Sequence, residues 1–294
     1  FEHATTFGSL IQVPEGLAAK LPALKQLSEA TSQDLFVSEA LKRLGPLVQQ
    51  AELLAAQYDA VVANPPYMGS KAYCPALKNF VNDVYRAGKA DLYAAFTLRN
   101  SALAKGGGHV GMITIPNWMF LSSFELLREE VTSRAPIVSL THNGRGVWGS
   151  DFGSCAYILR RCDISGLGGT FLRLFDKQSS VASNEELEKR FHHRKRFTIQ
   201  NSAFEKIPGT PIAYWVSNAV LQIFEEATSL GDQAQVAVGL QTGENERFLR
   251  QWFEVPHERI GLNCSDRTVA LSSGRKWFPY NKGGSFRKWY GNQD

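Results

Sequence analysis

The pattern of hydrophobic positions predicts a helical opening that leads into a sheet. Leucines recur at helical spacing over Glu15–Ala30 and Asp34–Gln57, and we expect the second helix to break at Gly45-Pro46 because proline interrupts a helix. A run rich in β-branched residues follows, Tyr58–Ala63, and it stops abruptly at Asn64-Pro65-Pro66. This run predicts a buried strand of the kind found in parallel sheets.

Helix and strand patterns alternate in the next part of the chain. We expect a helix over Asp91–Ala104, a stop at Lys105–Gly108 and a strand over His109–Ile115. A second helix and strand are expected over Leu121–Thr132 and Ile137–Thr141. The order strand, helix, strand, helix, strand is typical of an α/β sheet, so the predicted fold class is α/β.

The pattern changes further along. A glycine-rich turn over Asn143–Gly153 leads into a strand, Ser154–Leu159, which we expect to form a hairpin at the edge of the sheet. The remaining expected elements are a strand over Thr170–Phe175, a charged helix over Glu185–His193 and an amphipathic helix over Ile212–Ser229. Beyond Ser229, Gly and Asn residues typical of turns become frequent. We therefore place domain boundaries after residues 57 and 235, giving segments 1–57, 58–235 and 236–294.

Composition narrows the class of protein. The chain has 294 residues, 44% hydrophobic and 20% charged, which is ordinary for a folded protein of about two domains. The net charge of +4 is too small to indicate a polyanionic partner by itself. No apolar run approaches the ~20 residues of a membrane helix, and no signal peptide opens the chain, so we expect a cytoplasmic protein without membrane association. Because the chain starts at Phe1 rather than Met, we expect a piece of a longer polypeptide.

Cysteine and histidine spacing does not suggest a metal centre. The four cysteines form no C-x-x-C pair, and the six histidines are scattered along the chain. His192-His193 lies in a basic run, where a solvated helix face is the simpler interpretation. No metal site is expected.

The tetrapeptide Asn64-Pro65-Pro66-Tyr67 carries the clearest chemical signal. Two prolines fix the backbone and remove two donors, which leaves the Pro65 carbonyl rigid and available as an acceptor. The Asn64 side-chain oxygen is a second acceptor, and Tyr67 offers an aromatic face. Two fixed acceptors at the end of a strand can hold a planar exocyclic amine such as the N6 group of adenine and aim its lone pair at an electrophile. A purely structural turn is the alternative.

This tetrapeptide resembles the catalytic [DNS]-P-P-[YFW] motif of the amino-group DNA methyltransferases. Segments resembling later motifs of that fold follow in order, namely Asp91–Phe96, Gly106–Pro116 and Gly146–Trp148. The match is closer to the large adenine-specific enzymes of BREX phage defence and of type IIG restriction-modification. The segments that carry this impression are Phe1–Ile11, Asn64–Lys71, Gly149–Ser154 and Lys276–Gly284.

The resemblance implies a partial Rossmann-like, S-adenosylmethionine-dependent methyltransferase fold followed by the start of a target-recognition domain. Residues 1–57 would be a helical lead-in, 58–235 the C-terminal part of the catalytic domain and 236–294 the start of target recognition. Asn64 and Pro65 would accept the adenine amine, with Pro66 completing the rigid motif. Tyr67 and Trp148 would stack on opposite faces of the base.

One motif of the family is missing from the expected place. The F-x-G-x-G loop that backs the methionine end of the cofactor, and the acidic residue that holds its ribose, should precede the catalytic motif, and neither is present. Gly106-Gly107-Gly108 is no substitute, because it follows a helix and precedes a strand. We therefore expect the main S-adenosylmethionine-binding loop to lie upstream of this chain.

Two basic segments are candidates for contact with DNA. Residues 189–196 hold five Lys or Arg and no acid; a solvated helix end is as good an interpretation as phosphate contact. Residues 267–293 hold six Lys or Arg, no acid and six aromatics, a mixture that suits phosphate neutralisation and base stacking. The candidate DNA-binding residues are Arg194, Lys195, Arg196, Arg275, Lys276, Lys282, Arg287 and Lys288.

The predicted function is methylation of the N6 amine of adenine in double-stranded DNA, in restriction-modification or phage defence, with other defence-system subunits as possible partners. Such an enzyme must flip the adenine out of the stack. Two alternatives stay open. RNA and protein-glutamine methyltransferases also use N-P-P-Y, although their chains usually end soon after the sheet. A DNA-binding or scaffold subunit, or a fragment without activity of its own, is the second alternative.

Overall fold

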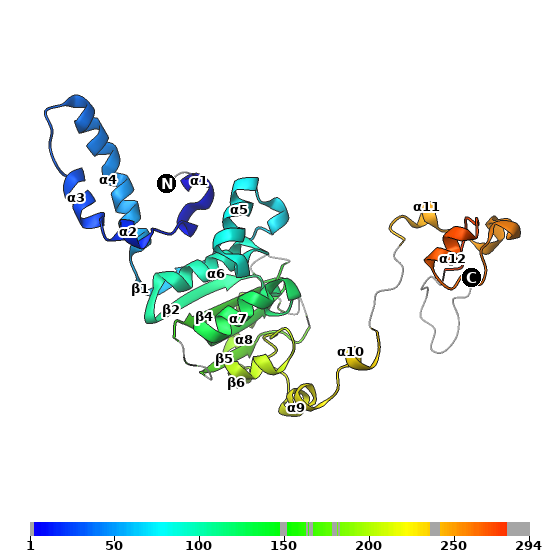
Figure 1. The fold of residues 1–294 in the computed structure, drawn as a ribbon. Coiled ribbons are helices and arrows are strands. Elements are labelled where there is room, and N and C mark those ends of the chain that lie inside the picture. The colour runs from blue at the N-terminus through cyan, green and yellow to red at the C-terminus, as the bar shows by residue number, and fades with distance from the viewer. Residues whose placement is uncertain are drawn as a thin grey trace. The chain divides into compact units, whose positions relative to one another are not determined.

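A six-stranded mixed sheet forms the centre of the first part of the chain in the computed structural model (Figure 1). Its strand order is β1-β2-β4-β3-β5-β6. β1 and β2 are parallel, as are β3 and β5, whereas β4 is antiparallel to both β2 and β3, and β6 is antiparallel to β5. The strands are β1 Tyr58–Ala63, β2 Ala104–Thr114, β3 Ile137–Gly144, β4 Ser154–Arg160, β5 Gly168–Arg173 and β6 Arg196–Gln200. This arrangement confirms the predicted α/β class.

The structure describes residues 3–147, 152–162, 164, 167–177, 181, 183–235 and 242–280. The chain divides into two compact units, Phe1–Ala227 and Thr228–Asp294. The helices of the first unit are α1 Ala4–Phe7, α2 Glu15–Ala18, α3 Leu21–Ser28, α4 Leu35–Ala55, α5 Pro75–Val84, α6 Leu92–Leu103, α7 Glu125–Arg134, α8 Asn184–His193 and α9 Asn218–Glu226. Those of the second unit are α10 Leu230–Gln233, α11 Asn245–Phe248 and α12 Arg267–Ser272.

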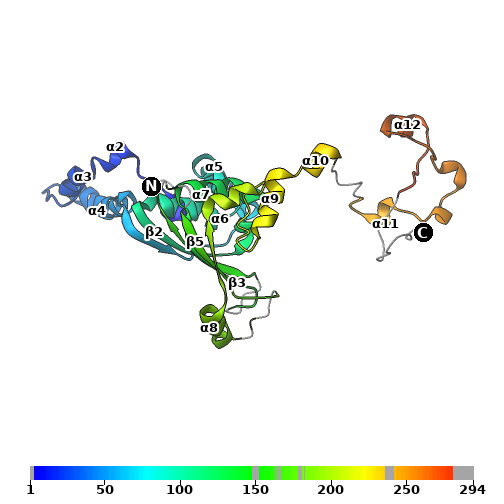
Figure 2. The same cartoon turned by 90° about the horizontal axis from the view of Figure 1, so that it is seen from below.

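Helices α6 and α7 pack on the sheet and enclose the main core (Figure 2). Tyr93 of α6 and Leu127 of α7 lie in one buried cluster with Val110, Leu140 and Tyr157 from three strands. These residues are almost wholly removed from water, which is the main source of stability for this part of the fold. The described residues contain no helix that is both long and apolar enough to cross a membrane.

The N-terminal helices differ from the prediction at Pro46. The expected break does not occur, because α4 runs without interruption from Leu35 to Ala55. Because proline has no backbone N–H, Pro46 cannot donate a hydrogen bond to the carbonyl of Lys42. Both residues are exposed, so water can replace this helical hydrogen bond.

Strand β1 is less buried than predicted. It lies at the edge of the sheet and, within the described residues, pairs with β2 alone. Val62 is 83% exposed as a result. The glycines of Lys105–Gly108, expected to end a helix, instead belong to β2. The register of the β1–β2 pairing shifts at this point, between Tyr58 and Ala60 of β1. Gly107 has φ +81, a conformation that glycine adopts without strain, so the shift is accommodated there.

Strand β4 lies inside the sheet rather than at its edge. It forms the predicted hairpin with β3 but also pairs with β2 on its other side. Alternate residues Cys155, Tyr157 and Leu159 are buried, which matches a central position.

The two predicted helices at 121–132 and 212–229 are shorter than expected. Two 3₁₀ turns, Pro116–Met119 and Ser122–Phe124, precede α7, which begins at Glu125. α9 begins only after Ser217, whose side chain accepts a hydrogen bond from the Val220 amide. The segment before it is not helical, because Ile212 and Tyr214 insert into the main core instead.

Candidate active site

The carboxyl ends of four parallel strands meet at one edge of the sheet. β1, β2, β3 and β5 run in the same direction, since β4 is antiparallel to its two neighbours and β3 is parallel to β5. Asn64 follows directly on β1 at this edge, which we call the carboxyl edge. Ligands of open α/β sheets bind outside such carboxyl ends.

The predicted catalytic motif is exposed at three of its four residues. Asn64, Pro66 and Tyr67 are exposed, whereas Pro65 is buried and holds the turn against the fold. In the part of the chain that the structure describes, no group donates a hydrogen bond to the Pro65 carbonyl. An amide oxygen and a free carbonyl thus stand one residue apart at the end of a strand.

The Tyr67 side chain links this motif to β2. Its hydroxyl lies 3.0 Å from Asn64 Oδ1 and 3.2 Å from the carbonyl oxygen of Ile113. The phenol carries one proton, so it donates to one of these acceptors at a time. The Tyr67 ring meets Tyr93 edge-on at 6.2 Å and stays 45% exposed, and burial raises the pKa of its hydroxyl. The ring is therefore fixed in place, with part of its surface open.

Asp91 anchors the segment that follows Tyr67. Its Oδ1 accepts hydrogen bonds from the amides of Met68, at 3.0 Å, and Tyr93, at 3.4 Å, so one carboxylate both caps α6 and holds the loop. The Leu92 amide donates to the Met68 carbonyl at 2.9 Å. Burial raises the pKa of the Asp91 carboxyl, and the hydrogen bonds from Met68 and Tyr93 oppose that shift. An acidic N-cap opening a predicted helix is the sequence signal for this residue, which sequence reasoning did not assign to the site.

The two remaining family-like segments contribute differently. The family-like segment Gly106–Pro116 lies mostly in β2, and the end of this strand supplies the Ile113 carbonyl. Gly146 has φ +78 and Val147 is buried. Trp148, the predicted second stacking face, lies outside the described residues.

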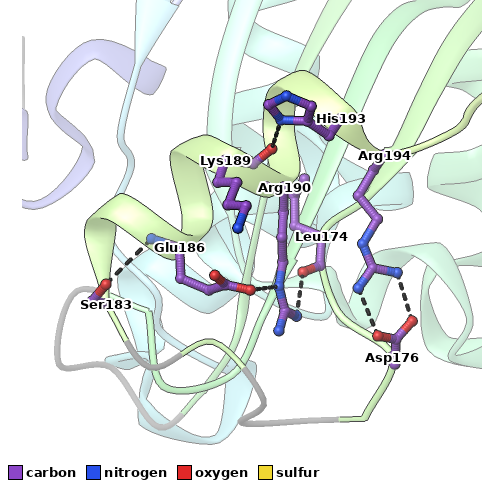
Figure 3. Close-up of polar contacts among 8 residues, drawn as sticks. All are labelled: Leu174, Asp176, Ser183, Glu186, Lys189, Arg190, His193 and Arg194. Atoms are coloured by element: carbon purple, nitrogen blue, oxygen red, sulfur yellow. Dashed lines mark hydrogen bonds and ion pairs between the residues drawn. The ribbon is translucent and has the colours of Figure 1, made fainter.

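The first basic segment is partly engaged in ion pairs (Figure 3). Arg194 donates two hydrogen bonds to the carboxylate of Asp176, at 2.5 and 2.6 Å, and these lower the pKa of that carboxyl. Arg190 donates to Glu186 within α8 and to the Leu174 carbonyl after β5. Lys195 and Arg196 are exposed and form no ion pair with a described residue.

The second basic segment lies in the second unit and is only partly described. Arg275 and Lys276 are exposed there. The Lys276 ammonium sits 5.7 Å from the centre of the Trp277 ring. Lys282, Arg287 and Lys288 lie outside the described residues.

The described residues offer no metal site and no cradle for a nucleotide cofactor. They contain no cluster of three potential metal ligands. Gly106–Gly108 lie within β2, and a Cβ on Gly144 would meet the Phe175 ring at 2.7 Å, so that glycine serves packing. The four cysteines form no disulfide. The expectation that the main S-adenosylmethionine-binding loop lies upstream of this chain stays a prediction.

Comparison with known proteins finds similar methyltransferases. Residues 20–147 match the Eco57I restriction-modification methylase family. The chain is 38% identical over 302 residues to the adenine-specific methyltransferase BrxX of Escherichia coli O9:H4 (strain HS), covering 100% of this chain and 24% of the relative. It is 36% identical over 254 residues to the adenine-specific methyltransferase PglX of Lacticaseibacillus casei (strain Zhang), covering 84% of this chain and 21% of that relative. The resemblance predicted from the motifs is thus confirmed.

The chain spans about a quarter of the length of these relatives. Among the solved structures with partial similarity is that of a DrdV–DNA complex, with TM-score 0.44 and 13% identity over 61% of this chain and 20% of that one. Another is that of the type IIG restriction endonuclease BpuSI, with TM-score 0.41 and 14% identity over 56% of this chain and 22% of that one.

Proposed function

We propose that the natural protein carrying this chain methylates the N6 amine of adenine in double-stranded DNA, in host-DNA modification or phage defence. The observation that carries the proposal is the pair of acceptors at the end of β1, Asn64 Oδ1 and the Pro65 carbonyl, beside the half-exposed ring of Tyr67. The family match and the names of the relatives support the same chemistry.

We assign each residue of the motif a role towards the amine. Asn64 Oδ1 and the Pro65 carbonyl each accept one N6 hydrogen, which keeps the amine in a fixed orientation and its lone pair directed away from both acceptors. The Tyr67 hydroxyl lies 3.0 Å from Asn64 Oδ1, but when the amine arrives it can rotate and donate its hydrogen bond to the Ile113 carbonyl instead. The site therefore releases Asn64 without leaving the hydroxyl unpaired.

The base reaches this site only after flipping, which takes a few kcal/mol of unstacking energy. We propose that the exposed part of the Tyr67 ring stacks on one face of the adenine and Trp148 on the other. S-Adenosylmethionine supplies the methyl group when bound. We place the cofactor's main loop outside this chain.

We also propose the two basic segments as DNA contacts. Lys195 and Arg196 are available in the described structure, and Arg194 can contribute by exchanging Asp176 for a phosphate. Arg275, Lys276, Lys282, Arg287 and Lys288 would act within a target-recognition domain that starts near residue 236.

Substitution of Asn64 tests the proposed function. In the natural protein, Asn64→Ala is expected to lower methyl transfer to duplex DNA by about 10² or more, because a positioned hydrogen bond to the reacting amine is lost. DNA affinity should change little. Asn82→Ala, which alters an exposed asparagine of α5, is the matched control and should keep the full rate.

Two results would contradict the proposal. One is an Asn64→Ala protein that keeps more than half of the wild-type rate. The other is a wild-type protein that transfers methyl groups to RNA or to protein glutamine but not to duplex DNA, measured with the same labelled donor.

A further inference from the structure

Five side chains from four segments gather near the carboxyl edge, away from Asn64. We call them the Arg173 cluster: Phe120, His142, Arg173, Phe175 and Trp215. Arg173, the last residue of β5, is in register with His142 of β3. Ring centroids lie 4.8 Å apart between His142 and Phe175, and 5.6 Å apart between Phe120 and Trp215.

Arg173 is a half-buried cation for which the described residues provide no hydrogen-bond or ion-pair partner. Its guanidinium carbon lies 4.6 Å from the centre of the Phe175 ring and 5.3 Å from that of Trp215. Within the described part of the chain it forms no hydrogen bond or ion pair, and its Nε is buried without an acceptor. By contrast, the buried Arg128 donates to the carbonyls of Trp118, Leu121 and Gly209. Leaving such donors unpaired costs free energy that an anionic ligand would recover.

The surroundings of Arg173 favour an anion with an apolar part. Phe120 and Trp215 beside it are 38% and 39% exposed. Asp176, the acid three residues along, interacts electrostatically with Arg173, but both of its carboxylate oxygens accept hydrogen bonds from Arg194 (Figure 3). His142 does not add charge near neutral pH, because burial and the nearby Arg173 lower its pKa to about 4.

The cluster is also suitably placed for a long ligand that enters the Asn64 site. The strand order puts β5 four positions from β1, which is about 19 Å at ~4.8 Å per strand. Duplex DNA rises ~3.4 Å per base pair, so this separation corresponds to about five or six base pairs.

We propose that the Arg173 cluster binds the sugar-phosphate backbone of the duplex that flanks the target adenine. Arg173 contacts a phosphate, and Phe120 and Trp215 pack against the adjoining sugars. The contact positions the duplex without reading its sequence. This inference rests on the proposed function, since it takes the DNA to be the substrate held at Asn64.

The test is the salt dependence of DNA binding by the natural protein, with a mixed-sequence duplex as the probe. Arg173→Ala should weaken binding several-fold and lower the slope of log K against log salt by about 0.9, the value for one phosphate contact. Arg173→Lys should retain the slope. Trp215→Ala should weaken binding with the slope unchanged, because no charge is removed.

Arg134→Ala is the matched control. Arg134 is an exposed cation at the end of α7, paired with Glu130, just before β3 begins and hence at the opposite edge of the sheet. Its removal changes the net charge equally but should leave the slope unchanged. If Arg173→Ala does not fold, Arg173→Gln, which keeps a long polar side chain, replaces it.

The outcomes separate the two proposals. An unchanged slope in a folded Arg173→Ala protein overturns the DNA contact, including the case in which only thermal stability falls. If the slope is unchanged in Arg173→Ala while the wild type methylates DNA and Asn64→Ala does not, the proposed function holds and the Arg173 contact does not. A wild type that neither binds nor methylates DNA overturns both.

Discussion

The Tyr67 hydroxyl has one proton and two acceptors within reach, and its ring has a face open to solvent. These two parts of the side chain predict different effects of substitution. Tyr67→Phe keeps the ring and frees Asn64 Oδ1, so methylation should stay within about threefold of wild type. Tyr67→Ala removes the stacking face, which is worth about 1–3 kcal/mol per base, and should lower both DNA affinity and rate.

Single-turnover methylation and binding to a duplex with the target adenine unpaired would measure both effects. If Tyr67→Phe is as impaired as Tyr67→Ala, the hydroxyl and not the ring carries the function of this residue.

His142 gives a pH-dependent prediction at the residue scale. Its folded pKa of about 4 lies below the ordinary value of 6.5, and both ring nitrogens are buried without a partner among the described residues. Between these pH values the unfolded state binds the proton and the folded state does not, so stability falls as pH drops from about 6.5 to 4. The loss is on the order of 3 kcal/mol.

His142→Gln lacks this titration. The difference in free energy of unfolding between wild type and His142→Gln should therefore shift in favour of the variant as pH falls through this window, as measured by denaturant unfolding. A difference that stays constant from pH 7 to pH 4.5 would show that His142 is protonated in the folded state at normal affinity.

At the scale of elements, Asp91 couples the start of α6 to the loop after the catalytic motif. Asp91→Ala should destabilise the fold by about 1 kcal/mol through loss of the N-cap. It should also lower the methylation rate, because Met68 loses its anchor. Asp34→Ala is the matched control, since Asp34 caps α4 by accepting from the Phe36 and Val37 amides but contacts no site residue.

Thermal unfolding and methylation assays on both variants make the comparison. If Asp91→Ala and Asp34→Ala lose the same stability and both keep the wild-type methylation rate, Asp91 has only a capping role.

Local signals in the sequence were enough to predict several elements. Asp91 and the following apolar residues predicted α6, and the β-branched run predicted β1. What failed depended on neighbours distant in sequence. The central position of β4 and the exposure of Val62 follow from the strand order, which the periodicity of a single segment does not contain.

The same distinction holds for the candidate site. Asn64–Tyr67 is contiguous, so residue types and spacing are enough to propose its chemistry, which stays a prediction. The bond from Asp91 to Met68, the Ile113 acceptor and the Arg173 cluster join segments that are brought together only by folding. Arg194 shows the opposite case, because its basic neighbours predicted a solvated or DNA-bound charge and the fold pairs it with Asp176.

At the scale of the whole molecule, the acceptor site lies in the first unit, at the carboxyl edge of the sheet, while Arg275 and Lys276 lie in the second. The chain matches its relatives over only about a quarter of their length. In our proposal the described residues hold the amine and contact DNA, whereas the main loop for the methyl donor lies outside this chain.

This division predicts that the 294-residue chain alone binds S-adenosylmethionine weakly or not at all. A nucleotide loop needs glycines that follow a strand and open a helix, with backbone amides free for the ligand. Gly106–Gly108 are instead part of β2, and Gly144 is packed on Phe175. Calorimetric titration of the isolated chain should give no micromolar affinity, with the full-length Escherichia coli relative as the positive control. Micromolar binding by the isolated chain would contradict this prediction and would mean that its residues form a cofactor site of a different design.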